Sequence, residues 1–145
     1  MTALATWKHR GTLYVTGNSS AESSVDATPR QIAALATKGV EVGLTVDTAN
    51  KYITINTAGD YLVVASISFS GTLSKVFNVA IYKNTSSTGF MLERKMGTGG
   101  DVGAGSVNGI VTCAVGDDIS LYQSSTDGGT AFTATDAQLS VIRLS

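Results

Sequence analysis

The most constraining feature of this sequence is the segment DYLVVASISFS at residues 60–70, where apolar residues occupy both alternating rows. Successive side chains of a β-strand point to opposite faces of its sheet. One row, which suits a hydrophobic core, holds Tyr61, Val63, Ala65, Ile67 and Phe69. The second row begins with Leu62 and Val64 and then changes to serine. The predicted strand therefore needs an apolar cover on part of its second face as well.

Similar short segments, separated by turn residues, continue along most of the chain. They are GTLYVTG (11–17), VEVGLTV (40–46), KYITIN (51–56), KVFNVAIYK (75–83), GFMLERKM (89–96), SVNGIVTCAV (106–115), DISLYQSS (118–125) and AQLSVIRL (137–144). The last segment is also apolar on both sides, because Leu139 and Val141 alternate with Ile142 and Leu144. Many short strands with few helices predict an all-β antiparallel sandwich or jelly roll, since a parallel sheet needs more crossover helices.

One short helix is predicted within DATPRQIAALATKGV, residues 26–40. Thr28 suits the N-cap, Pro29 suits the first helical position, and Gln31 completes a capping-box spacing. Lys38 and Gly39 supply an end signal. The apolar stripe of this helix would be Ile32, Leu35 and Ala36. We expect one structural domain in which residues 1–39 carry a short strand, a polar loop and this helix, and residues 40–145 form the jelly roll.

Length and charge exclude several classes of function. A chain of 145 residues suits a single domain with a substantial core. Its net charge is -1, and the basic residues are scattered, so no stripe is available to bind a nucleic-acid backbone. No apolar run approaches the roughly 18 residues of a membrane span, and no secretion signal is apparent. The sequence predicts a soluble protein that binds neither nucleic acid nor membrane.

The residues needed for catalysis or metal binding do not form a recognisable pattern. His9 is the one histidine, which argues against a triad or a zinc site. Cys113 is the one cysteine and lies in the apolar run GIVTCAVG, so a buried thiol is the favoured interpretation. Asp117 and Asp118 are adjacent, and their side chains would diverge in a turn. We therefore expect no catalytic residue.

The glycine-rich loops contain candidate ligand atoms. Asp101 and Asp127 could offer oxygen atoms to calcium, but their spacing matches no dedicated calcium loop. The segment MGTGGDVGAGS at residues 96–106 has the glycines of a phosphate cradle without the lysine, the spacing or the following helix. It is interpreted as a flexible connection between strands, and no cofactor or metal is expected.

Four short motifs resemble the jelly roll of complement globular heads and tumour-necrosis-factor-like proteins. They are GDYLV (59–63), AIYKN (80–84), AVGDDISLYQ (114–123) and LSVIRL (139–144). In that family a Gly-x-Tyr turn opens a central strand, a Gly-Asp turn precedes the penultimate strand, and the last strand lines a threefold axis. The resemblance covers residues 40–144, without the collagen-like repeat and signal peptide of animal members and with an extra helix. Compact versions of this kind resemble tailed-bacteriophage head-decoration (cement) proteins and fibre-head domains.

This resemblance implies a homotrimer in which one sheet of each subunit packs against the same sheet of two neighbours. The residues that it would place in the interface are Leu62, Val64, Ile110, Ile142 and Leu144. The second apolar face of the opening segment would then be the centre of the trimer. The alternative from the residues alone is that a sandwich edge or the helix covers these side chains within one chain.

The N-terminal segment contains a cluster of Trp7, Lys8, His9 and Arg10, which is unusual in a chain with 14% charged residues and one tryptophan. Trp and Arg are enriched in the hot spots of interfaces. One hypothesis is that these four residues anchor the trimer to an acidic or apolar surface such as a capsid shell. The alternative is that the segment is simply the first strand, with Trp7 inside the sandwich.

Together with the resemblance, these features predict a non-enzymatic virion protein, a trimeric capsid decoration or cement protein that stabilises an icosahedral head. Its partners would be its own copies and the major capsid protein, on the capsid surface, after synthesis in the host cytoplasm. The alternative is a fibre-tip or adhesion module that binds a host glycan or protein through loops such as NTSSTG (84–89) and SSTDGGT (124–130). A hydrolase or lyase is disfavoured because no base and nucleophile can be nominated.

Overall fold

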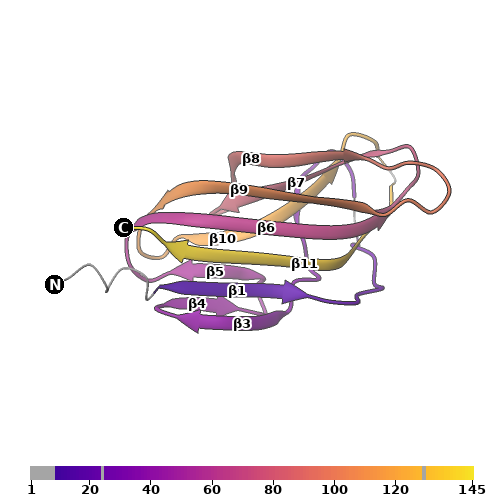
Figure 1. Ribbon diagram of the computed structural model, residues 1–145. Helices are drawn as coiled ribbons and strands as arrows, with labels where there is room; N and C mark the ends of the chain where they lie inside the picture. The colour runs from indigo at the N-terminus through magenta and orange to yellow at the C-terminus, as the bar shows by residue number, and fades with distance from the viewer. Residues whose placement is uncertain (1–8, 24, 129) are drawn as a thin grey trace.

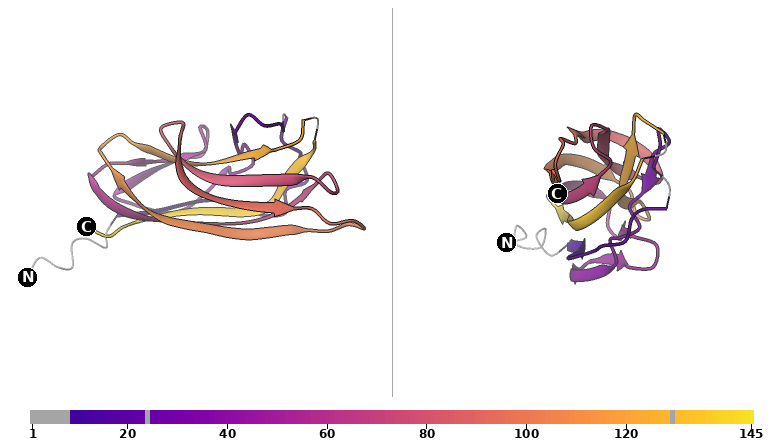
Figure 2. Two further views of the ribbon diagram at one scale, coloured as in Figure 1. Left: turned by 90° about the horizontal axis from the view of Figure 1, so that it is seen from above. Right: turned by 90° about the vertical axis from the view of Figure 1, so that its right-hand side faces the viewer.

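A computed structural model describes residues 9–23, 25–128 and 130–145 of the protein. The described residues form two β-sheets packed face to face, with the strands along the long axis of the molecule (Figures 1 and 2). Every strand pair among them is antiparallel. The prediction of an all-β antiparallel sandwich is confirmed, and the arrangement is consistent with a jelly roll.

The two sheets are called sheet A and sheet B. Sheet A contains, in spatial order, β3 (Thr37–Val42), β1 (Arg10–Val15), β11 (Phe132–Arg143), β6 (Gly59–Gly71) and β9 (Gly103–Cys113). Sheet B contains β4 (Leu44–Asp47), β5 (Tyr52–Ile55), β10 (Asp118–Ser125), β7 (Val76–Lys83) and β8 (Ser86–Lys95), with β2 (Arg30–Gln31) paired to β10. Because β1 and β3 belong to sheet A, residues before position 40 contribute to the same sandwich as the rest of the chain.

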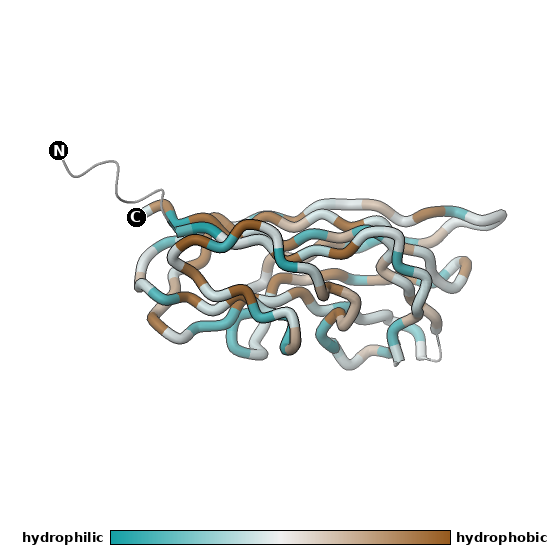
Figure 3. Tube along the Cα trace, turned by 90° about the horizontal axis from the view of Figure 1, so that it is seen from below, coloured by the Kyte–Doolittle hydropathy of each residue, from teal (hydrophilic) through white to brown (hydrophobic). Residues whose placement is uncertain are grey.

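The core lies between the two sheets and is built from the inward rows that the alternation predicted. Figure 3 shows hydrophobic positions recurring along the strands between more polar ones. Fully or almost fully buried residues include Tyr61, Val63, Ala65, Ile67 and Phe69 of β6, and Phe77, Val79 and Ile81 of β7. Three phenylalanines pack together at one end of the core. The ring centroid of Phe69 lies 5.7 Å from that of Phe77 and 4.8 Å from that of Phe132. These inward rows hold the two sheets together.

The predicted helix is wrong, because the described residues contain no helix and this segment is extended or in turns. Its backbone donors bind elsewhere in the fold: the N–H of Ile32 donates to the carbonyl of Leu121 at 2.9 Å, and the N–H of Ala33 donates to the carboxylate of Glu22 at 3.1 Å. Ile32 and Leu35 are nevertheless fully buried, as an apolar stripe would be. A helix this short is marginal by itself, so tertiary contacts override the capping signals.

The segment VEVGLTV is two strands instead of one. Gly43 lies between β3 and β4 with φ of 66°, and the chain passes there from sheet A to sheet B. A left-handed backbone of this kind favours glycine. A Cβ atom at this position would also collide with the ring of His9. The glycine therefore permits the corner that places β3 and β4 in different sheets.

The connection predicted over residues 96–106 is too long, because β8 ends at Lys95 and β9 already begins at Gly103. On its inner face, β9 carries small residues where large side chains approach. A Cβ atom on Gly109 would overlap the ring of Phe90 in β8, and one on Gly105 would lie 3.2 Å from Leu92. Glycine in a strand often marks such a close approach. These glycines let β8 fold against β9 along one side of the sandwich.

The Gly-x-Tyr motif forms the start of β6. Tyr61 is fully buried, and its hydroxyl donates to the carbonyl of Thr57 at 2.6 Å in the connection from β5. The carboxylate of Asp60 accepts a hydrogen bond from the hydroxyl of Thr112 at 2.6 Å. The backbone carbonyl of Asp60 accepts one from the N–H of Leu144 at 2.8 Å. The turn thus joins the neighbouring strand β9 and the residues after β11.

Candidate functional site: the outer face of sheet A

The outer face of sheet A brings the predicted interface residues together. Leu62 in β6 lies opposite Ile110 of β9 on one side and opposite Ile142 of β11 on the other. Val64 follows two residues later on the same face, and Leu144 follows Ile142 just after β11 ends. Four of these side chains are half-buried, whereas Ile110 is 58% exposed. They form an apolar surface at the end of the sandwich where the C-terminus lies (Figure 1).

Neither of the two described layers covers this face. Sheet B lies on the opposite side of sheet A (Figure 2), and the helix that was one candidate cover is not present among the described residues. The row on the other side of β11 is fully buried, as expected for a strand with one face in the core: Leu139 and Val141 have no exposed surface. The last strand therefore has the two-sided apolar character that its sequence predicted.

The same face changes from apolar to polar along its length. After Val64, β6 continues with Ser66 and Ser68, and Ser66 lies between Ser106 of β9 and Gln138 of β11. A strand rises about 3.3 Å per residue, so Leu62 and Ser68 are roughly 20 Å apart. The face consequently has an apolar end and a polar end.

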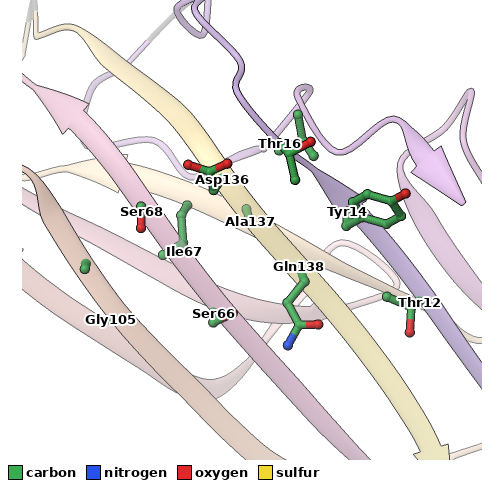
Figure 4. Close-up of a pocket in the computed structure, with 12 residues that line it drawn as sticks. Thr12, Tyr14, Thr16, Ser66, Ile67, Ser68, Gly105, Asp136, Ala137 and Gln138 are labelled. Carbon is green, nitrogen blue, oxygen red and sulfur yellow. The ribbon is translucent and has the colours of Figure 1, made fainter. Parts of the chain in front are cut away.

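A hollow of about 590 Å³ lies at the polar end, across four strands of sheet A (Figure 4). It is lined by Thr12, Tyr14, Val15, Thr16, Ser66, Ile67, Ser68, Ala104, Gly105, Asp136, Ala137 and Gln138. The strands β6 and β9 contribute mostly small side chains, whereas β1 and β11 contribute larger ones. This size difference between neighbouring strands makes the face concave.

A break in strand register places a charged group beside the hollow. The pairing of β11 with β6 shifts between Ala134 and Asp136. Such irregularities re-aim side chains and occur often beside functional sites. The carboxylate of Asp136 accepts a hydrogen bond from the N–H of Gly17 at 3.0 Å, which ties it to the loop after β1.

Sequence reasoning did not identify this hollow, although part of its signal was visible. The change from Leu62 and Val64 to Ser66 and Ser68 marks the small side chains of β6. The wall formed by Tyr14 and Gln138 depends on the pairing of β1 with β11, two strands more than 120 residues apart in the chain. No pattern of neighbouring residues in the sequence predicts that β1 pairs with β11.

The predicted N-terminal anchor lies only partly within the described residues. Trp7 and Lys8 fall outside them. His9 is half-buried beside Gly43, and Arg10 is the exposed first residue of β1, opposite Ile142 and Val42. Arg10 therefore belongs to the first strand of the sandwich, and the anchoring role of the cluster stays a prediction.

The candidate reactive groups make structural contacts. Cys113 is buried, and burial raises the pKa of its thiol to about 11, so it is protonated and poorly nucleophilic near neutral pH. Asp117 accepts hydrogen bonds from the N–H of Ala114 at 2.8 Å and from the side chain of Asn84 at 2.6 Å, which lower its pKa. The side chain of Asp118 binds Thr54 instead, so the two aspartates diverge as predicted.

The loop carboxylates considered for calcium are engaged by cations of the protein. Arg94 lies 2.9 Å from the carboxylate of Asp101, which also accepts a hydrogen bond from the N–H of Gly97, and Lys75 lies 3.7 Å from that of Asp127. Within residues 9–23, 25–128 and 130–145, no three His, Cys, Asp or Glu side chains are grouped as metal ligands. Nor does this part of the chain contain a helix long and apolar enough to cross a membrane.

Comparison with solved structures shows that the chain shares the jelly-roll fold of APRIL and of a complement globular domain. The chain is similar to murine APRIL, determined at pH 5.0, with 13% sequence identity, a TM-score of 0.63, and coverage of 93% of this chain and 99% of that one. It is similar to the globular domain of the zebrafish complement 1qA protein, with 12% identity, a TM-score of 0.63, and coverage of 95% and 98%. No protein-family model and no curated protein sequence matches the chain. At such low identity the similarity concerns the fold.

Proposed function

We propose that this protein is a non-enzymatic structural protein that forms a homotrimer through the apolar end of the outer face of sheet A, and that the trimer decorates and stabilises an icosahedral virion shell. Its partners would be two further copies of the same chain and the major capsid protein. Its location would be the capsid surface. The virion role follows from the sequence resemblance described above, and the self-association has support from geometry.

The observation that carries the proposal is the apolar end of sheet A. Side chains of Leu62, Ile110 and Ile142, from three adjacent strands, lie side by side in register on a face that no described layer covers. Burial of apolar surface yields about 25 cal/mol per Å². The contribution of a few such side chains is repeated in every symmetry-related copy, which favours a closed oligomer.

A structural role is also consistent with the reactive groups of the described residues. The buried thiol of Cys113 packs in the core, and Asp117 holds the turn before β10. Neither residue lines the hollow, and the thiol of Cys113 is buried instead of lying on the outer face. The proposal therefore assigns the outer face of sheet A to binding and assigns no residue to catalysis.

Light scattering coupled to gel filtration tests the self-association. Leu62→Asp and Ile142→Asp would place charges on a surface that assembly must desolvate, and such charges are strongly unfavourable when they stay unpaired. We expect a trimeric mass for the wild type and a monomeric mass for both variants. Their unfolding transitions should remain cooperative, because the inward neighbours Val63 and Val141 are unchanged.

The matched control is Ser124→Asp, which adds the same charge to β10 on the outer face of sheet B and should stay trimeric. A wild-type chain that is monomeric at micromolar concentration would contradict the proposed self-association. A trimer in both charged variants would show that another face forms the interface. The virion role has its own test: a reconstruction that finds the protein only at the tail would contradict decoration of the head.

A further inference from the structure

We propose that the hollow at the polar end of sheet A is a binding site for one neutral saccharide unit. The site lies on strands, so it differs from the loops 84–89 and 124–130 that the sequence suggested for adhesion. Its volume of about 590 Å³ falls within the roughly 300–1,000 Å³ typical of small-molecule sites. The inference does not depend on the trimer.

The shape of the hollow suits a flat, ring-shaped ligand. Ser66, Ser68 and Ala104 leave space above β6 and β9, while Tyr14 and Gln138 stand along β1 and β11 (Figure 4). An aromatic side chain offers an apolar ring with a polar tip. A sugar ring likewise has apolar C–H faces and polar hydroxyl groups at its edge, so Tyr14 can contact both parts of such a ligand.

The hydrogen-bonding groups of the hollow match a ligand with several hydroxyls. The amide of Gln138 both donates and accepts, the hydroxyls of Thr16 and Ser68 do the same, and an ionised carboxylate is an acceptor only. The carboxylate of Asp136 has about four acceptor positions, and the N–H of Gly17 uses one of them. A hydroxyl can donate to Asp136 and accept from its neighbours, and a sugar presents several such groups.

The charge of the lining selects against anionic ligands. Asp136 is the one charged residue among those that line the hollow, and no Lys, Arg or His lines it. Phosphorylated or acidic sugars would be repelled by Asp136 without a compensating cation. A hard cation such as Ca²⁺ is usually held by several carboxylates, and Asp136 is the one carboxylate of this lining. A neutral sugar therefore matches the whole lining.

The hollow and the apolar end are separate parts of one face. Ser68 lies roughly 20 Å along β6 from Leu62. Association through Leu62, Ile110 and Ile142 does not require the side chains that line the hollow. Ligand binding and self-association can therefore be tested independently by substitutions at the two ends.

Saturation-transfer NMR on the full chain is the direct test. The probes are methyl α-D-glucopyranoside and methyl β-D-galactopyranoside, with N-acetylneuraminic acid as an anionic counterpart. We expect transfer to at least one neutral glycoside and at least about ten-fold less to the acid. Ser68→Trp should fill the hollow and abolish the transfer. Ser70→Trp, on the same face of β6 but outside the lining, should retain it.

The saccharide site would be overturned by no transfer to either neutral glycoside, by equal transfer to the anionic sugar, or by unchanged transfer in Ser68→Trp. Light scattering on Ser68→Trp adds a further check, because the variant should keep the mass of the wild type. Loss of association in this variant alone would mean that a neighbouring copy fills the hollow, which also rejects the site. A monomeric mass for the wild type would instead contradict the proposed trimer and would not bear on the saccharide site.

Discussion

The contact between Gly109 and Phe90 shows how a missing side chain determines packing. Because a Cβ atom on Gly109 would overlap the ring of Phe90, Gly109→Ala must displace the ring or the strand. Overpacking of this kind typically costs about 1–3 kcal/mol. We expect the midpoint of urea unfolding to fall by a corresponding amount. The control is Gly128→Ala, where nothing lies within 4 Å of the added atom.

A second substitution separates overpacking from an intrinsic effect of alanine. In the double variant Gly109→Ala with Phe90→Ala, the ring that causes the overlap is absent. The glycine substitution should then cost much less than it does beside the intact ring, so the two changes should be strongly non-additive. Additive losses of stability would contradict the steric explanation.

At the level of strands, the side chain of Glu41 in β3 links sheet A to β4 of sheet B, beside the corner at Gly43. Its carboxylate accepts a hydrogen bond from the N–H of Val46 in β4 at 2.7 Å and one from the ammonium of Lys38 at 3.0 Å. These contacts hold the pKa of Glu41 below its usual value. Stability from this group is therefore present above the pKa of the unfolded chain and is lost as the pH falls through the lower, folded pKa.

Amide hydrogen exchange at Val46 measures this contact. Glu41→Gln should raise the exchange rate of the Val46 amide at neutral pH, because the replacement is a weaker, uncharged acceptor and no longer pairs with Lys38. In the wild type the protection of the Val46 amide, relative to the intrinsic exchange rate at each pH, should fall on acidification through the pKa of Glu41. A Val46 amide that exchanges equally in both proteins at neutral pH would show that the carboxylate does not hold β4.

At this scale of single elements, alternation was a reliable guide and the helix-capping signals were not. The inward rows of β6 and β7 were predicted because burial of one face imposes a period of two residues. The capping signals from Thr28 to Gly39 failed, because Glu22 and Leu121 supply partners to the same backbone groups. The split at Gly43 was missed, since one glycine within an alternating run also fits a continuous strand.

Alternation along single strands also predicted part of the candidate site. Residues on one face of a single strand follow from alternation, so Leu62 with Val64, and Ile142 with Leu144, could be assigned together. That these rows and Ile110 lie side by side depends on the order of strands in sheet A, which the sequence suggested only through a resemblance. The hollow depends in addition on side-chain size across four strands, and it emerged only from the structure.

For the whole molecule, the anchoring hypothesis can be tested without disturbing the sandwich. Deletion of residues 1–8 removes Trp7 and Lys8 but leaves β1, which begins at Arg10, intact. We expect a folded trimer that no longer binds virion shells lacking the protein, measured by co-sedimentation. The control is Lys75→Ala, which removes one positive charge far along the chain. Undiminished binding by the deletion variant would reject the anchor, and loss of folding would favour a role of this segment in the sandwich.

The pairing of β1 with β11 also determines how the molecule responds to mechanical force. The two strands are antiparallel neighbours, with Arg10 opposite Ile142 and Val15 opposite Ala137, so the first strand begins where the last one ends. The ladder bonds of such a pair run perpendicular to the strands. A pull on Arg10 against Arg143 would break these bonds one pair at a time, from Arg10 towards Val15, instead of loading them all in shear. Held by its two ends, the sandwich should open at low force and release β1 first.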